Sequence, residues 1–148
     1  MKKIIVLFVL SCFISSVFPA PKPFSSLSNK DLSYEELVAA PKTVLFIWTT
    51  WCPSCRSEFL RMAKECVQYE GVEMLFINSG EREALVQRFI ESIKLQECVK
   101  EKTILDPELV LAKKFSVFSI PAFIIIKDGK FIHKSSFLSQ EIIDAAFK

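Results

Sequence analysis

The chain has 148 residues, of which 51% are hydrophobic, and this is enough for one domain with a substantial core. Its formal net charge is +2, from 19 basic and 17 acidic residues. If Lys2 and Lys3 leave with an N-terminal segment, the basic and acidic counts become equal, so no basic surface for a nucleic acid is expected.

The first twenty residues have the pattern of a secretory signal peptide or an N-terminal anchor. A basic start, Met1–Lys3, precedes a fifteen-residue apolar run (4–18) and a proline-rich stretch. Because a comfortable membrane span needs ~17–25 residues, the run favours a cleaved signal over a permanent anchor. Cleavage after Ala20, cleavage after Ser16 and lipidation of Cys12 are the alternatives. Each places the remaining chain outside the cytoplasm, in the periplasm or secreted, with or without a membrane tether.

Residues 21–32 are rich in proline and serine, which predicts a flexible tether. The folded domain is therefore expected to span residues 33–148. Ser33 and Glu36 have the spacing of a capping box for a short helix that runs to about Ala40.

Residues 43–51 (TVLFIWTTW) predict a buried strand, because β-branched and aromatic side chains dominate this run. The strand leads directly into Cys52-Pro53-Ser54-Cys55, and Pro53 suits the first turn of a helix. Apolar residues then recur at helical spacing: Cys55, Phe59, Met62, Ala63, Cys66 and Val67. Cys52 is thus expected at a helix N-terminus, where unpaired N–H groups and the helix dipole stabilise a thiolate. Cys55, one turn later on the inward face, can close a disulfide with it.

A static disulfide and one half of a zinc site are the alternatives for this cysteine pair. Zinc needs about four ligands, yet no second CxxC motif accompanies this one and His133 is the only histidine. The position of the motif at a strand-to-helix junction favours a redox-active dithiol. We therefore expect no metal site and no cofactor other than the Cys52–Cys55 disulfide itself.

The stretch FIWTTWCPSCRSEF resembles the active site of the thioredoxin superfamily, and in particular its TlpA/ResA-like extracytoplasmic branch, W-x-x-W-C-x-x-C-[RK]-x-E. With the downstream elements, the resemblance covers residues 43–148. It implies an α/β, thioredoxin-like fold with a central mixed sheet of four to five strands flanked by helices. It also implies that Cys52 is the nucleophile, that Cys55 is the resolving thiol and that Glu58 assists proton transfer. An exposed helix glutamate is the alternative for Glu58.

Two positions depart from the family pattern. Phe46 stands where cytoplasmic thioredoxins carry a buried aspartate, so Glu58 or water must accept the proton. Leu60 stands where many relatives have a helix-kinking proline. Trp48 and Trp51 flank the dithiol in the family, although aromatic rings on a buried strand are also ordinary core residues.

Further along the chain, residues 72–78 predict a second buried strand and residues 81–95 an amphipathic helix. The order strand, helix, strand, helix requires parallel pairing with right-handed crossovers.

Residues 96–102 are polar and have no clear pattern. Residues 103–105 suggest a short strand, and Asp106-Pro107 is typical of a helix start, with Asp106 as the cap and the helix ending near Phe115.

Ile120-Pro121 precedes another apolar strand. Most bonds of this kind are trans, with only about 5–6% cis. The resemblance implies the opposite here, because thioredoxin-like proteins carry a cis-proline that faces the dithiol. The implied roles are to shield the dithiol from metal ions and to let the backbone of Ile120 pair with an extended substrate. Together with Trp51, Pro53 and Ser54, this loop is the expected substrate-binding surface.

Residues 123–137 predict a β-hairpin, because Asp128-Gly129 tolerates the positive φ of a two-residue turn. Ser139 would cap a final helix that ends at Phe147. His133 falls on the outer strand of this hairpin and is expected to face solvent.

The two remaining cysteines of the expected domain are Cys66 and Cys98. Cys66 lies eleven residues after Cys55, about 16 Å along a helix, so it cannot reach the dithiol. The pair forms either a structural disulfide or two buried free thiols.

These observations predict a monomeric, extracytoplasmic thiol–disulfide oxidoreductase. The resemblance implies protein disulfides as substrates, apocytochrome c or other exported proteins among them, and a membrane electron donor. An oxidase or isomerase with the same dithiol is the alternative within the enzyme class. A non-catalytic thioredoxin-fold binding module or metal chaperone is the alternative outside it, and it is disfavoured because no histidine or methionine cluster accompanies the cysteines.

Overall fold

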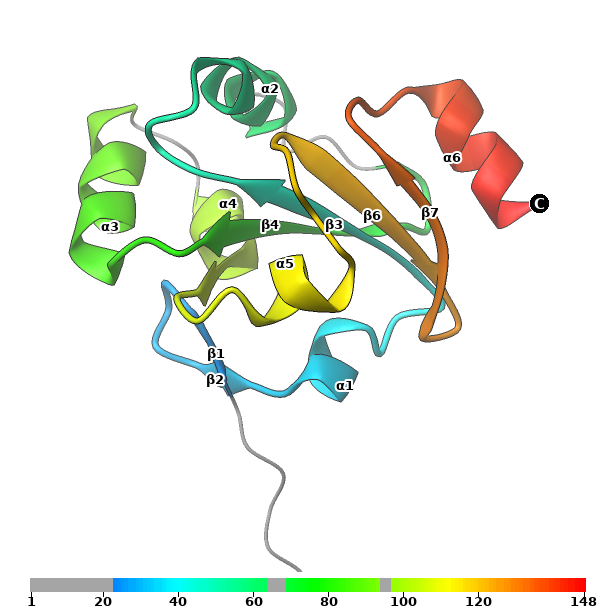
Figure 1. Ribbon diagram of the computed structural model, residues 1–148, viewed down its shortest axis with the longest axis horizontal. Helices are drawn as coiled ribbons and strands as arrows, with labels where there is room; N and C mark the ends of the chain where they lie inside the picture. The colour runs from blue at the N-terminus through cyan, green and yellow to red at the C-terminus, as the bar shows by residue number, and fades with distance from the viewer. Residues whose placement is uncertain (1–22, 64–68, 94–96) are drawn as a thin grey trace, which may run out of the picture.

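In the computed structural model, which describes residues 23–63, 69–93 and 97–148, one mixed β-sheet separates two layers of helices (Figure 1). The strands are β1 (Phe24–Ser26), β2 (Asp31–Leu32), β3 (Lys42–Trp48), β4 (Glu73–Ser79), β5 (Thr103–Asp106), β6 (Ala122–Lys127) and β7 (Lys130–Ser135). The helices are α1 (Tyr34–Leu37), α2 (Pro53–Ala63), α3 (Glu83–Ser92), α4 (Glu97–Lys102), α5 (Val110–Lys114) and α6 (Gln140–Phe147).

The strand order in the sheet is β2-β1-β5-β4-β3-β6-β7. The three central strands β5, β4 and β3 run parallel, and the flanking pairs are antiparallel. Because parallel strands end at the same edge of a sheet, the connections after β3, β4 and β5 leave from one edge (Figure 1). Residues that follow β3, β4 and β5, which are far apart in the sequence, therefore lie at the same edge of the sheet.

The residues of β3 alternate between two hydrophobic clusters, because successive side chains of a strand point to opposite faces. Val44, Phe46 and Trp48 pack on the face covered by α2, α3 and α6. Leu45 and Ile47 pack on the face covered by α1 and α5. The whole of β3 after its first residue is buried, which explains its continuous apolar sequence.

The predicted flexible tether over residues 21–32 is wrong from Phe24 onward, and the sheet has seven strands among the described residues rather than four to five. β1 pairs with β5 in antiparallel register, and β2 pairs with β1. The Phe24 side chain is 1% exposed and belongs to the α1/α5 side of the core. The composition of residues 21–32 does not predict this hairpin, because the hairpin is stabilised by pairing with the edge of β5 and not by the strand propensity of its own residues.

The helix predicted to begin at Asp106-Pro107 begins later, at Val110. The side chain of Asp106 still binds the first turn of this helix, since its carboxylate oxygens accept hydrogen bonds from the N–H groups of Val110 (2.7 Å) and Leu111 (2.9 Å). A turn intervenes, in which Leu109 has a φ of 58° and its N–H donates to the Asp106 carbonyl. The N-cap position is Leu109 and not Asp106, so the predicted cap and helix start are both corrected, although the Asp106 carboxylate does bind the first N–H groups of the helix.

Other local predictions agree closely with the structure. Ser33 and Glu36 form the capping box, and Ser139 accepts a hydrogen bond from the Ile142 N–H as the cap of α6. The β6–β7 hairpin turns at Asp128 and Gly129, both with positive φ. Residues 97–102, which showed no clear pattern, form the helix α4.

Candidate active site

The two cysteines of the CxxC motif lie where the chain passes from β3 to α2. Cys52 immediately precedes Pro53, the first residue of α2, and its sulfur is bonded to that of Cys55, with a Cα–Cα distance of 5.2 Å. Cys55 is fully buried and Cys52 is 5% exposed. The predicted pair is therefore formed, and only Cys52 offers any surface to solvent.

The backbone around Cys52 has the geometry expected of a helix N-terminus. The Cys52 carbonyl accepts a hydrogen bond from the Arg56 N–H (3.0 Å), which makes Cys52 the residue that caps α2. The Cys55 N–H donates to the Cys52 sulfur at 3.2 Å, and the Ser54 hydroxyl lies 3.4 Å from the same sulfur. After reduction, these donors would be in place to stabilise a Cys52 thiolate.

The two tryptophans next to the dithiol have opposite environments. Trp48 is fully buried, and its ring centroid lies 4.3 Å from that of Phe59 on α2. Trp51 is 70% exposed. Pro53 and Ser54 are also exposed, so the surface beside Cys52 includes Trp51 and the first turn of α2. Trp48 is a core residue, whereas Trp51 is available to a partner.

The Ile120–Pro121 peptide bond is cis, as the resemblance implied. The bond immediately precedes β6, whose first residue, Ala122, is the register partner of Ile47 on β3. Because β6 runs antiparallel to β3, this register places Pro121 level with Trp48, the last residue of β3, after which the connection to Cys52 begins. Ile120 and Pro121 are both half-buried.

Glu58 lies one turn after Cys55, and its carboxylate pairs with Arg61. The Arg61 guanidinium donates to both carboxylate oxygens, from Nε at 3.1 Å and from Nη2 at 2.5 Å. This contact raises the pKa of Arg61 above its ordinary value. The predicted proton-transfer residue thus has a partner that lies further from the dithiol along α2.

Glu81 is a residue of the site that sequence reasoning treated only as the start of a helix. Its carboxylate accepts hydrogen bonds from the Thr50 N–H (2.7 Å), the Thr50 hydroxyl (2.6 Å) and the Asn78 amide (2.7 Å). Thr50 is two residues before Cys52. A feature of the sequence could have predicted that Glu81 belongs to the site. It is an acidic residue that directly follows a predicted parallel strand, and it therefore lies at the sheet edge that also carries the CxxC motif.

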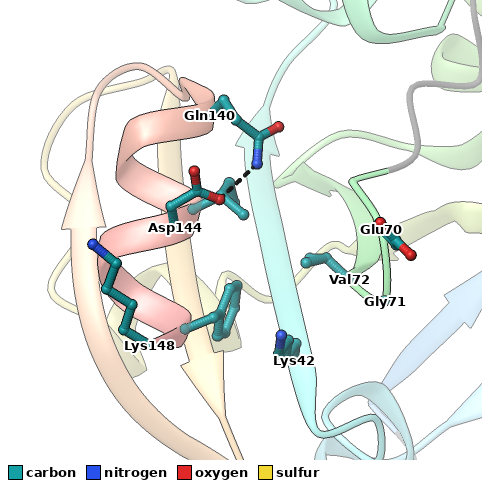
Figure 2. A pocket seen from close by; sticks show the side chains of 9 residues that line it. Lys42, Glu70, Gly71, Val72, Gln140, Asp144 and Lys148 are labelled. Carbon is teal, nitrogen blue, oxygen red and sulfur yellow. Dashed lines mark hydrogen bonds between the residues drawn. The ribbon is translucent and has the colours of Figure 1, made fainter.

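A groove of about 650 Å³ lies at the opposite end of β3 (Figure 2). It is lined by Lys42, Glu70, Gly71, Val72, Gln140, Ile143, Asp144, Phe147 and Lys148. Lys42 is the first residue of β3, so the strand separates this groove from the dithiol by about 20 Å. The groove does not belong to the active site.

The described part of the chain contains no cluster of three or more histidine, cysteine or acidic side chains that could hold a metal ion. None of its helices is long and apolar enough to cross a membrane. Cys66, and with it the question of a Cys66–Cys98 disulfide, lies outside the described residues, as does the predicted signal segment.

Comparison with known proteins agrees with this geometry. The AhpC/TSA family profile matches residues 18–135. Sporulation thiol-disulfide oxidoreductase A of Bacillus subtilis (strain 168) is 25% identical over 122 residues, 79% of this chain and 70% of that protein. Thiol-disulfide oxidoreductase ResA of the same organism is 31% identical over 91 residues, 60% of this chain and 49% of that protein. The chain therefore spans about half the length of this second relative.

The fold has a counterpart among solved structures. The crystal structure of StoA from Bacillus subtilis superimposes with a TM-score of 0.64, covering 85% of this chain and 98% of that one at 20% identity. The predicted thioredoxin-like fold is confirmed by this likeness, and the enzyme class by the names of both relatives. The chain belongs to the AhpC/TSA family, as a thiol–disulfide oxidoreductase with a thioredoxin-like fold.

Proposed function

We propose that this protein reduces disulfides of exported proteins outside the cytoplasm, with Cys52 as the attacking sulfur and Cys55 as the resolving one. The observation that supports these roles is the position of Cys52 at the N-terminus of α2, with the Cys55 N–H 3.2 Å from its sulfur. A sulfur in this position is stabilised as a thiolate, the form that attacks disulfides. Cys55 is buried, so a substrate reaches Cys52 first.

The proposed cycle transfers two electrons. The Cys52 thiolate attacks one sulfur of the substrate disulfide, forms a mixed disulfide and releases the other substrate sulfur as a thiolate. Cys55 loses its proton and attacks Cys52, which closes the Cys52–Cys55 disulfide and releases the second substrate thiol. The protein is then in the oxidised form seen in the structure. A membrane electron donor would return it to the dithiol.

The proposed substrate-binding surface consists of the exposed residues beside Cys52 and the cis-proline loop. Trp51, Pro53 and Ser54 are exposed, and the half-buried Ile120 and Pro121 adjoin the same end of β3. An extended segment of a substrate protein could pair with the backbone at Ile120 while its disulfide meets Cys52. Apocytochrome c and other exported proteins with an exposed disulfide fit this description.

Location outside the cytoplasm rests on the N-terminal sequence pattern, a basic start followed by an apolar run. The same pattern allows a cleaved signal, an anchor or lipidation at Cys12. Mass determination of the mature protein from a membrane and a soluble fraction would distinguish the three. An intact Met1 in a soluble cytoplasmic fraction would contradict the proposed location.

Glu58 is proposed to accept the proton of Cys55, since Phe46 leaves no buried carboxylate on β3 for this task. To do so its carboxylate would have to leave Arg61, with which it pairs on α2. Glu58→Gln should then change the pH dependence of thiol alkylation in the reduced protein. If the pH dependence of alkylation is unchanged, the Glu58–Arg61 pair only stabilises the helix, as contacts between residues three positions apart commonly do.

The central test is reduction of insulin by dithiothreitol, with the protein as catalyst. The wild type should accelerate insulin precipitation, Cys52→Ser should be inactive, and Cys55→Ser should accumulate the mixed disulfide with insulin. Absence of catalysis by the wild type would remove the enzymatic proposal and leave a binding module.

The direction of electron flow is tested by equilibrating the protein with glutathione. Proteins of this fold have potentials from about −270 to about −120 mV. A value near the oxidising end would replace the proposed reductase with an oxidase.

A further inference from the structure

The connection that carries Cys52 is anchored by a side chain from another part of the chain. β3 ends at Trp48 and α2 begins at Pro53, so residues 49–52 cross from sheet to helix. Within the described ranges, the side chain that binds this connection from a distance is that of Glu81. One carboxylate oxygen accepts from the Thr50 N–H at 2.7 Å, and the other from the Thr50 hydroxyl at 2.6 Å.

Asn78 holds the same carboxylate from the side of β4. Its amide donates to Glu81 Oε2 at 2.7 Å, and its side chain is fully buried. Asn78 is also the register partner of Trp48, the last residue of β3. The carboxylate therefore binds both Thr50, just after the end of β3, and Asn78, near the end of β4, which is the adjacent parallel strand.

The backbone just before Glu81 is tied to a third strand. The Gly80 N–H donates to the carbonyl of Asp106, the last residue of β5, at 2.9 Å. Gly80 has a φ of 77°, which favours glycine, and a Cβ at this position would lie 3.0 Å from the Leu109 side chain. Glu81 thus extends from a corner whose backbone conformation is closely restricted.

We propose that Glu81 is a positioning residue for Cys52, which it holds at the N-terminus of α2 through its two hydrogen bonds to Thr50. The inference rests on the proposed function only in taking Cys52 as the attacking sulfur. A displacement of about 1 Å can cost about 100-fold in the rate of a reaction that depends on alignment. Loss of the Thr50 anchor should therefore slow attack by Cys52 about 10- to 100-fold.

Two conservative variants, Glu81→Gln and Glu81→Asp, distinguish the effect of the length of the Glu81 side chain from the effect of its charge. Glu81→Gln keeps the length: its oxygen can accept from the Thr50 N–H and from Asn78, and its amide can donate to the Thr50 hydroxyl. Glu81→Asp keeps the charge but is one methylene group shorter, so it cannot bridge Thr50 and Asn78. Positioning predicts that Glu81→Gln behaves like the wild type and that Glu81→Asp behaves like Glu81→Ala.

The readout is the rate of Cys52 alkylation by iodoacetamide against pH in the reduced, folded protein, with Cys52 identified by peptide mapping. In Glu81→Asp and Glu81→Ala the pKa of Cys52 should rise toward about 8.5, the value of an unperturbed cysteine. A purely structural role would lower the thermal midpoint without changing this profile. The matched control is Glu83→Ala, which removes an exposed carboxylate two residues away on α3.

The possible results decide the inference. A folded Glu81→Asp protein with the wild-type profile would overturn it, and if Glu81→Gln were then perturbed, the charge of Glu81 would be the cause. A Glu81→Gln protein as perturbed as Glu81→Asp would also overturn it, because a glutamine that can keep the hydrogen bonds to Thr50 should keep the profile. If Glu81→Ala does not fold, the Asp and Gln variants decide alone. The alkylation assay uses no substrate, so a wild type inactive on insulin would refute the proposed reductase and leave this inference to be decided by the alkylation profiles.

Discussion

Phe59 is a fully buried aromatic residue of the active-site helix, so its truncation is a direct test of how α2 packs on the sheet. It lies one turn after Cys55 on α2 and is fully buried. Its ring centroid is 4.3 Å from Trp48 on β3, 5.0 Å from Phe76 on β4 and 5.8 Å from Phe89 on α3. Phe59→Ala would remove all three ring contacts at once.

The expected loss follows from this burial. Truncation of a core phenylalanine to alanine costs about 3–5 kcal/mol, and aromatic pairs contribute about 0.5–1.5 kcal/mol beyond buried area. With three ring partners, Phe59→Ala should lose about 4–5 kcal/mol of unfolding free energy. Native domains have about 5–15 kcal/mol in total, so the variant should be marginally stable, with a melting temperature lowered by about 8–20 °C.

The assay is urea unfolding of the oxidised protein, followed by far-UV circular dichroism. Leu60→Ala is the matched control, because it truncates the next residue of the same helix, which is only half-buried. This control should lose about 1–2 kcal/mol. If Phe59→Ala loses less than about 2 kcal/mol of unfolding free energy, or no more than Leu60→Ala loses, then the ring contacts of Phe59 do not stabilise the packing of α2 on the sheet.

Two other regions allow further tests. A protein that lacks residues 1–32 should have an unfolding free energy at least about 3–5 kcal/mol lower than one that lacks residues 1–22, because the longer truncation deletes the buried Phe24 and uncovers β5. Equal stability of the two truncated proteins in urea would restore the tether interpretation. Burial raises the pKa of Asp106 above its ordinary value of 3.8, against the opposing effect of its backbone hydrogen bonds. A raised carboxyl pKa contributes stability that is present below 3.8 and is lost as the pH rises through the folded-state pKa. We therefore expect the unfolding free energy of Asp106→Asn, relative to that of the wild type, to increase as the pH rises from 3.5 to 7, as measured by urea unfolding. If the difference in unfolding free energy between the two proteins did not change with pH, the effect of burial on the pKa of Asp106 would be contradicted.

The active-site turn was predictable because its determinants are close together in sequence. An apolar strand, two cysteines three positions apart and a proline at the first helical turn specify the strand-to-helix junction without help from the rest of the chain. The same holds for the Ser33 capping box and for the Asp128-Gly129 turn. Local chemistry selects each of these conformations, and tertiary packing then agrees with it.

The cis peptide at Pro121 could be expected only from the resemblance to a family, because an X-Pro bond considered alone is most often trans. The β1–β2 hairpin could not be expected at all. Its strands are short and polar in part, and they are stabilised by the edge of β5, which is formed by residues some eighty positions later. No pattern within residues 21–32 contains that edge.

The amino-acid sequence by itself determined which two sulfurs react together and that one of them begins a helix, since both facts depend on neighbours within a single turn. Only the tertiary structure decided what surrounds that turn. Parallel pairing of β3 with β4 brings Glu81 to Thr50 across 31 positions, and antiparallel pairing of β6 with β3 brings Pro121 to the same end of the sheet. Such contacts depend on strand register, which is set by how the whole core packs and by no local stretch of the chain.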